Sequence, residues 1–250
     1  RDLVVDDEKK DPRDFALWKR DPNHLMQWHS PWGWGFPGWH LECSVMALEY
    51  LGEEIDIHGG GEDLIFPHHE CEIAQAECVS GSTFARYWVH TRFLQVEGEK
   101  MSKSKGNFHT VNALVSSRAD GGREIDPYAL RLSLISGHYR KPYNFTFDTL
   151  RANMRHIERL RTAIETIESA PSGDSQIGSR LSELSDLMLM AMLDDLNTPE
   201  AITAMLEGTK LIISTSGGMT DEDRIAARNF VDRIDGLLGV APLSDVSTSS

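Results

Sequence analysis

The chain is poor in cysteine, in long apolar runs and in positive charge. Its three cysteines are too few, and odd in number, for a disulfide framework, which predicts a reducing compartment and a cytoplasmic protein. No apolar run approaches the ~18 residues of a membrane span, so no membrane partner is expected. The formal net charge of −14 excludes attraction of the whole chain to nucleic acid, because that attraction needs many contacts of Lys and Arg with phosphates. Any contact with RNA must come from local basic patches, while the acidity itself serves solubility.

One segment that is present carries an unusual charge pattern. Residues 100–107 hold Lys100, Lys103 and Lys105 among small side chains, with nothing apolar to pack into a core. Cations held in place around a phosphate are the usual means of assisting triphosphate chemistry. The segment therefore predicts a phosphate-binding loop, although a lysine–serine run can equally be solvated surface.

The first part of the chain alternates between helical and extended patterns. Hydrophobic residues make up 40% of the chain, enough for a core in one large or two modest domains. The order of elements indicates an α/β fold with a parallel sheet, in which ligands gather at the carboxyl ends of strands. The predicted elements are a helix over 40–50, a strand over 55–58 with a tight glycine loop at 59–61, a helix over 68–79 with Pro67 in its first turn, and a strand over 88–96. The glycine loop and the lysine loop both follow strands, so we expect both to face one site.

After about residue 145 the pattern becomes purely helical. Apolar residues recur at three- and four-residue intervals, which predicts amphipathic helices packed as a bundle. We expect Thr198 to cap one helix and Pro199 to be its first residue. The predicted helices cover residues 150–167, 181–196, 198–214 and 221–238.

Three side chains could hold a metal ion. His68 and Glu72 are four residues apart on one predicted helix and so lie on one face, and Cys43 lies near the start of the preceding helix. A thiolate, an imidazole and a carboxylate together suit zinc. The spacing leaves alternatives open, because a histidine and a glutamate at this distance often form a surface hydrogen bond. Other residues compete for the role or are simply buried: His69, Cys71 and Cys78.

Several longer segments resemble the cysteinyl-tRNA synthetases, a family of class I aminoacyl-tRNA synthetases. They follow one another in the family's order and cover most of residues 10–240. The segments are 30–33 (SPWG), 38–44 (GWHLECS), 56–61 (DIHGGG), 63–70 (DLIFPHHE), 72–75 (EIAQ), 100–107 (KMSKSKGN), 138–140 (HYR) and 195–199 (DLNTP).

The resemblance implies one zinc ion per chain, held by Cys43, His68 and Glu72 and by a further cysteine. In the family the thiolate of the substrate cysteine is thought to bind this metal, and Trp39 would wall the amino-acid pocket. A metal–thiolate bond separates cysteine from serine, which a hydrophobic pocket alone discriminates by only about 10²-fold.

The resemblance also implies an ATP site and a reaction. L-cysteine would be activated by ATP, with Mg²⁺, to cysteinyl-adenylate and then transferred to tRNA(Cys), with the helical bundle packed against the tRNA and the chain acting as a monomer. The implied residues are, for the adenylate, Gly59, Gly60, Gly61 and Asp63 and, for the phosphates, Lys103 supported by Lys100.

The implied domains are the second half of a Rossmann-like catalytic domain with the zinc site (residues 1–97), a lysine-loop and stem-contact region (98–145), a tRNA-binding helical bundle (146–241) and a disordered tail (242–250). Two family elements have no counterpart in the chain, a His-x-Gly-His signature and the first zinc cysteine. We therefore expect the isolated chain to be unable to activate cysteine.

Two alternative functions stay open. One is a ligase of the same superfamily that joins cysteine to glucosaminyl-inositol, and the other is a non-catalytic fragment that binds tRNA or another partner. A zinc hydrolase is disfavoured, because such enzymes prefer a His-Glu-x-x-His arrangement.

Overall fold

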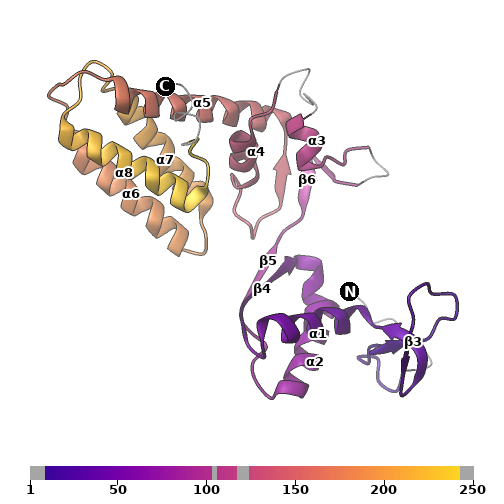
Figure 1. Ribbon diagram of the computed structural model, residues 1–250. Helices are drawn as coiled ribbons and strands as arrows, with labels where there is room; N and C mark the ends of the chain where they lie inside the picture. The colour runs from indigo at the N-terminus through magenta and orange to yellow at the C-terminus, as the bar shows by residue number, and fades with distance from the viewer. Residues whose placement is uncertain (1–8, 103–105, 117–123, 243–250) are drawn as a thin grey trace. The chain divides into compact units, whose positions relative to one another are not determined.

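The computed structural model describes residues 9–102, 106–116 and 124–242. The chain divides into two compact units, residues 1–92 and 93–250, and each has its own hydrophobic core (Figure 1). Lys103 and residues 243–250 of the predicted tail lie outside the described residues. Every helix in the described ranges is too short or too polar to cross a membrane.

The first unit is built around a βαβ element. Strands β4 (Ile55–Gly61) and β5 (Ala85–Thr91) pair in parallel and are joined by helix α2 (Glu70–Ser80). Helix α1 (Trp39–Leu51) precedes β4 and packs against α2. The parallel pairing confirms the α/β fold predicted from the alternation of elements. Four buried residues form the small core: Ile55, Ala76, Phe84 and Ala85.

Three predicted boundaries in this region are wrong. The glycines at 59–61 are the last residues of β4 and pair with β5, so they do not form a loop. The helix predicted from residue 68 begins at Glu70, because a wider turn precedes it in which Phe66 has an extended backbone (φ −134°, ψ 132°). The strand predicted over 88–96 is two strands in separate sheets, β5 and β6 (Leu94–Val96).

A small antiparallel sheet precedes α1. Its strands are β1 (Trp18–Lys19), β2 (Trp28–Ser30) and β3 (Gly33–Pro37), in the order β1-β3-β2. Glycine is required where this segment passes close to the chain before it. A Cβ atom at Gly38 would lie 2.0 Å from the carbonyl oxygen of Ala16.

The second unit opens with a three-stranded sheet of order β7-β6-β8. Strand β6 pairs antiparallel with β7 (Glu99–Lys100) and parallel with β8 (Tyr143–Phe145). Two short helices, α3 (Val111–Ser116) and α4 (Pro127–Leu134), lie between β7 and β8 in the chain.

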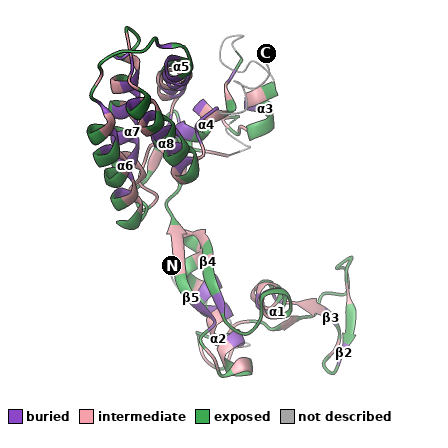
Figure 2. Cartoon of the chain, turned by 60° about the vertical axis from the view of Figure 1, so that its left-hand side comes forward, coloured by how far each residue is buried: buried purple, intermediate pink, exposed green. Residues whose placement is uncertain are grey.

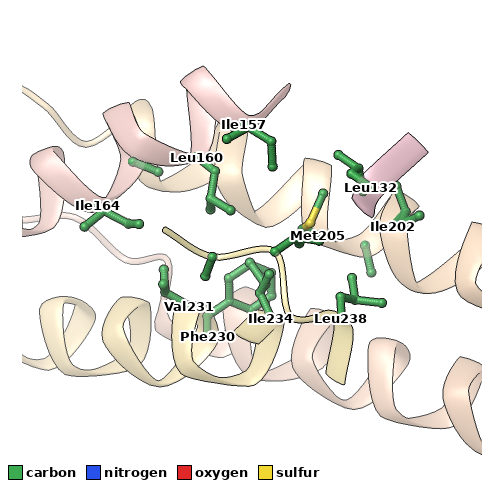
Figure 3. Packing of buried hydrophobic residues seen from close by; sticks show 14 of the residues in the cluster. Leu132, Ile157, Leu160, Ile164, Ile202, Met205, Phe230, Val231, Ile234 and Leu238 are labelled. Atoms are coloured by element: carbon green, nitrogen blue, oxygen red, sulfur yellow. The ribbon is translucent and has the colours of Figure 1, made fainter. Parts of the chain in front are cut away.

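Four longer helices complete the second unit and confirm the predicted bundle. Their buried apolar side chains meet in one core, which Figure 3 shows from close by. Thr198 is the first residue of its helix and Asn197 precedes it, so the prediction that Thr198 caps the helix is wrong by one position. The helices are α5 (Phe147–Ser169), α6 (Gly178–Leu193), α7 (Thr198–Ile213) and α8 (Asp221–Leu238).

A buried carboxylate fastens the start of α6 to α8. Asp223, only 5% exposed, accepts hydrogen bonds from the backbone N–H groups of Ile177 (3.1 Å) and Gly178 (2.7 Å) and from the hydroxyl of Ser175 (2.6 Å). Burial acts to raise the pKa of Asp223, but these hydrogen bonds outweigh it and hold the pKa below the usual value.

Replacing Asp223 with alanine should lower the free energy of unfolding by about 1–3 kcal/mol, because two backbone N–H groups lose their acceptor. The matched control is Asp221→Ala, in the same helical turn but exposed, which loses only an interaction with the helix dipole of about 0.3–1 kcal/mol. Urea unfolding followed by circular dichroism compares the two variants. Equal losses would contradict the role given to Asp223.

Candidate functional site

The structure brings together the three side chains that the sequence suggested as metal ligands. Cys43 comes from α1, His68 from the turn before α2, and Glu72 from the first turn of α2. One ligand atom of each lies within 4.8 Å of the other two. Cys43 is half-buried, whereas His68 and Glu72 are fully buried.

The carboxylate of Glu72 is the most constrained group of the site. It is 0% exposed, and burial raises its pKa to about 7. Nε2 of His68 lies 2.6 Å from its Oε1, and Nε2 of His58 lies 3.1 Å from its Oε2. Even so, neither oxygen accepts a hydrogen bond of normal geometry from the described residues. A buried carboxylate in this condition is stabilised by a cation, so the group fits a divalent metal ion.

A further histidine orients the imidazole of His68. Nδ1 of His40 lies 2.6 Å from Nδ1 of His68, which leaves Nε2 of His68 to face Glu72. Metal-binding histidines are usually held in this way through their second nitrogen. The ring of Trp39 lies 4.2 Å from the ring of His68 between centroids and is 57% exposed, so Trp39 borders the same site.

Three histidines form a group beside Glu72, of which the sequence analysis named His69 as a competing ligand but missed His58 and His90. His58 and His69 form with Glu72 a second group close enough to hold a metal, and Nδ1 of His69 lies 2.8 Å from Nε2 of His90. Burial, followed by the charges of the neighbouring histidines, lowers the pKa of His69 to about 4, so its imidazole is neutral near pH 7. The sequence pattern could have revealed two of these histidines. Side chains alternate between the two faces along β4 and β5, and this alternation places His58 and His90 on one face.

One of the predicted nucleotide-binding glycines, Gly60, is packed against this cluster. A Cβ atom at Gly60 would lie 2.8 Å from Cε1 of His69, and one at Gly61 would lie 2.6 Å from Oδ1 of Asp63. No larger side chain fits at either position without a shift of its neighbour. Gly59 and the side chain of Asp63 are exposed at the end of β4.

The described part of the lysine segment lies in the second unit. The side chain of Asn107 forms hydrogen bonds across it. Oδ1 of Asn107 accepts a hydrogen bond from the backbone N–H of Ser102 (2.9 Å), and its Nδ2 donates to the carbonyl of Lys100 (3.3 Å). Nζ of Lys100 lies 4.6 Å from the centre of the Phe93 ring. Asn107 therefore joins both ends of the segment that contains Lys103.

The hairpin that leads into this segment is tied to the start of the helical bundle. The carboxylate of Glu97 accepts a hydrogen bond from the backbone N–H of Phe147, at the first residue of α5 (2.8 Å). The backbone N–H of Gly98 donates to Oδ1 of Asn144 in β8 (2.8 Å).

Comparison with known proteins identifies the family. The family model described as "tRNA synthetases class I (C) catalytic domain" matches residues 1–155. A Cysteine--tRNA ligase of Salinibacter ruber is 55% identical over 96% of this chain and 49% of the relative, and one of Deinococcus radiodurans is 49% identical over 81% and 40%. LeuRS of Agrobacterium radiobacter K84, in a ternary complex with tRNA and LeuAMS, superposes with a TM-score of 0.63 over 90% of this chain and 34% of that chain. At 15% identity this last likeness shows the fold alone.

The family model covers the parallel βαβ element and the lysine segment, which places both in the catalytic domain of a class I tRNA synthetase. The chain belongs to the class I (C) tRNA synthetase catalytic-domain family. It spans about half the length of the curated relatives it matches.

Replacing Glu72 with glutamine should reduce the zinc content of the purified chain from roughly one ion per chain to almost none, because the amide keeps the shape but loses the charge. Inductively coupled plasma mass spectrometry measures this. The matched control is Glu70→Gln, at an exposed position in the same helical turn, which should keep its zinc. Zinc at the wild-type level in Glu72→Gln would show that this carboxylate is not a ligand.

Zinc affinity should fall as the pH drops below about 7. Glu72 and Cys43 must both lose a proton to bind a metal, and burial raises the pKa of both groups, in Cys43 together with the charges of Glu72 and Glu42. The protonated forms therefore persist to higher pH than usual and compete with the ion. Competition with a chromophoric chelator at several pH values gives the slope of zinc affinity against pH. This slope should be shallower in Cys43→Ala. An affinity independent of pH would contradict this ligand set.

Proposed function

We propose that this chain carries the amino-acid-selecting and phosphate-binding parts of a cysteine–tRNA ligase. The observation that carries the proposal is the buried Glu72 carboxylate. It has Cys43 and His68 within ligand distance and accepts no hydrogen bond of normal geometry from the part of the chain that the structure describes. Curated relatives named Cysteine--tRNA ligase, at 42–55% identity, support it.

Cys43, His68 and Glu72 are the residues that would hold a zinc ion, one per chain. When bound, zinc offers a soft acceptor for the thiolate of L-cysteine that the hydroxyl of serine cannot match. A hydrophobic pocket alone discriminates between such near-isosteres by only about 10²-fold. A discrimination of 10⁴-fold requires a difference in binding free energy of about 5.5 kcal/mol. Trp39, beside His68, forms a wall of the amino-acid pocket and excludes water from it.

Each unit carries residues that suit one part of ATP. Gly59, Gly60 and Gly61 allow the backbone at the end of β4 to approach the adenylate closely, and Asp63 accepts hydrogen bonds from the ribose hydroxyls. Lys103, with Lys100 in support, neutralises the phosphates of ATP, which enters with Mg²⁺. Asn107 holds the ends of this lysine segment in place.

The reaction needs no nucleophilic side chain. The carboxylate of cysteine attacks the α-phosphate of ATP, and pyrophosphate leaves with its electron pair. A hydroxyl of the ribose at the 3′ end of tRNA(Cys) then attacks the cysteinyl carbonyl and loses its proton, and AMP leaves. Positioning and charge stabilisation provide the catalysis. The helices α5 to α8 form the surface that packs against the tRNA.

Calorimetric titration of the zinc-loaded chain with L-cysteine and L-serine tests the proposal. Cysteine should bind more than about 10²-fold more tightly than serine, the limit set by an apolar pocket alone. Glu72→Gln should lose this preference, and Glu70→Gln should keep it. Equal binding of the two amino acids by the wild-type chain would refute the proposal.

The complete reaction is tested with and without an added segment that carries a His-x-Gly-His signature. ATP–pyrophosphate exchange should be absent with the isolated chain and should appear when the amino-terminal half of a curated relative is added, and Lys100→Ala should lower it again. Exchange above background by the isolated chain would show that the expected inactivity is wrong. Transfer of cysteine to glucosaminyl-inositol rather than to tRNA would favour the alternative ligase.

A further inference from the structure

One face of the small antiparallel sheet in the first unit carries a row of aromatic rings. We call it the aromatic face and define it by the side chains that the strand pairing and ring contacts place together: Lys19, His24, His29, Trp34 and Phe36. Neither the metal group nor the lysine segment uses any of these residues.

The register of the strands fixes which side chains share this face. His29 of β2 is paired directly with Trp34 of β3, and Lys19 of β1 is paired directly with Phe36. Directly paired residues in an antiparallel sheet project from the same side, and residues two apart on one strand do so as well. Trp28 is paired with Gly35 and therefore projects from the opposite side.

The rings of the aromatic face make contact with one another but remain open to solvent. The imidazole of His24 stacks on Phe36 with 3.8 Å between ring centroids, and His29 meets Trp34 edge-on at 5.8 Å. Trp34 is 61% exposed, and His24 and His29 are exposed as well. Strand β2, which carries His29, is drawn largely in the colour of exposed residues in Figure 2. Leaving a large indole in water gives up the free energy of burial, so this arrangement is typical of a binding surface.

The local charge also distinguishes this sheet from the rest of the chain. Residues 18–37 contain two cations, Lys19 and Arg20, and a single acid, Asp21, in a chain whose net charge is −14. The carboxylate of Asp21 accepts a hydrogen bond from the backbone N–H of Asn23.

Flat rings beside a cation match the chemistry of unpaired nucleotides. Each base offers a π-face that stacks on an aromatic side chain, and each phosphate pairs with a lysine or arginine. An aliphatic protein partner would instead call for a groove lined by branched side chains, and a membrane surface would call for several cations.

We propose that the aromatic face binds unpaired nucleotides of RNA, with Trp34 as the stacking platform and Lys19 as the contact to phosphate. This inference deepens the proposed function, on which the identification of the RNA as tRNA rests. The stacking itself depends only on the sheet.

Fluorescence anisotropy of a short fluorescein-labelled single-stranded RNA, titrated with the full 250-residue chain, tests the proposal. The same strand annealed to its complement should bind more weakly, because paired bases cannot stack on the sheet. Trp34→Ala should weaken binding of the single strand about tenfold or more, the range for loss of one base–aromatic stack. Trp34→Phe should restore most of it, and Lys19→Gln should reduce the dependence of binding on salt.

The matched control is Trp28→Ala, which removes an exposed indole from the opposite side of the same sheet and should leave binding within about twofold. Circular dichroism and thermal unfolding of each variant show that the sheet is folded. Unchanged binding by Trp34→Ala, an equal loss in Trp28→Ala, equal affinity for the duplex, or binding to phosphatidylserine vesicles in place of RNA would each overturn the proposal.

Measurement of cysteine and serine binding on the same preparations separates this inference from the proposed function. Selective binding of cysteine with no effect of Trp34→Ala on RNA would remove the inference alone. Loss of RNA binding in Trp34→Ala without any preference for cysteine would remove the function as a ligase and leave the RNA-binding face in place.

Discussion

A buried carboxylate that accepts no hydrogen bond of normal geometry from the described residues is the constraint around which the first unit is arranged. The Glu72 carboxylate is fully enclosed, and such a group is costly unless a cation compensates it or a proton neutralises it. The surrounding imidazoles are themselves held by other histidines, so the site offers nitrogen, oxygen and sulfur ligands in one place. A metal ion in this group would therefore add to the stability of the fold as well as to its chemistry.

Much of the second unit follows directly from the sequence. The apolar periodicity predicted all four long helices, and α8 begins and ends at the predicted residues. In the first unit the parallel sheet was predicted, but the glycine run at 59–61 was taken for a loop. Glycine by itself weakens a strand, so the sequence alone argued against one here. The ring of His69, which packs beside Gly60, explains why position 60 holds a glycine within the strand.

The candidate site, too, was predicted from the sequence only in part. The four-residue spacing of His68 and Glu72 was enough to place them on one face, and the ligand chemistry of Cys43 pointed to it. The second set of histidines depends on the pairing of β4 with β5, which brings together residues more than 30 positions apart, such as His58 and His90. Likewise, no local pattern shows that Asn107 bonds to both Ser102 and Lys100, because that contact depends on how the chain folds back.

The hydrogen bonds of Glu97 and Gly98 join two parts of the second unit, the hairpin β6–β7 and the start of the helical bundle. The hairpin entering the lysine segment is fastened to the first turn of α5 and to Asn144 in the strand beside it. A rotation of α5 about its long axis must then carry the hairpin with it or break these bonds. Any movement of α5 is therefore coupled to the hairpin that leads to Lys100, through contacts that lie within the second unit.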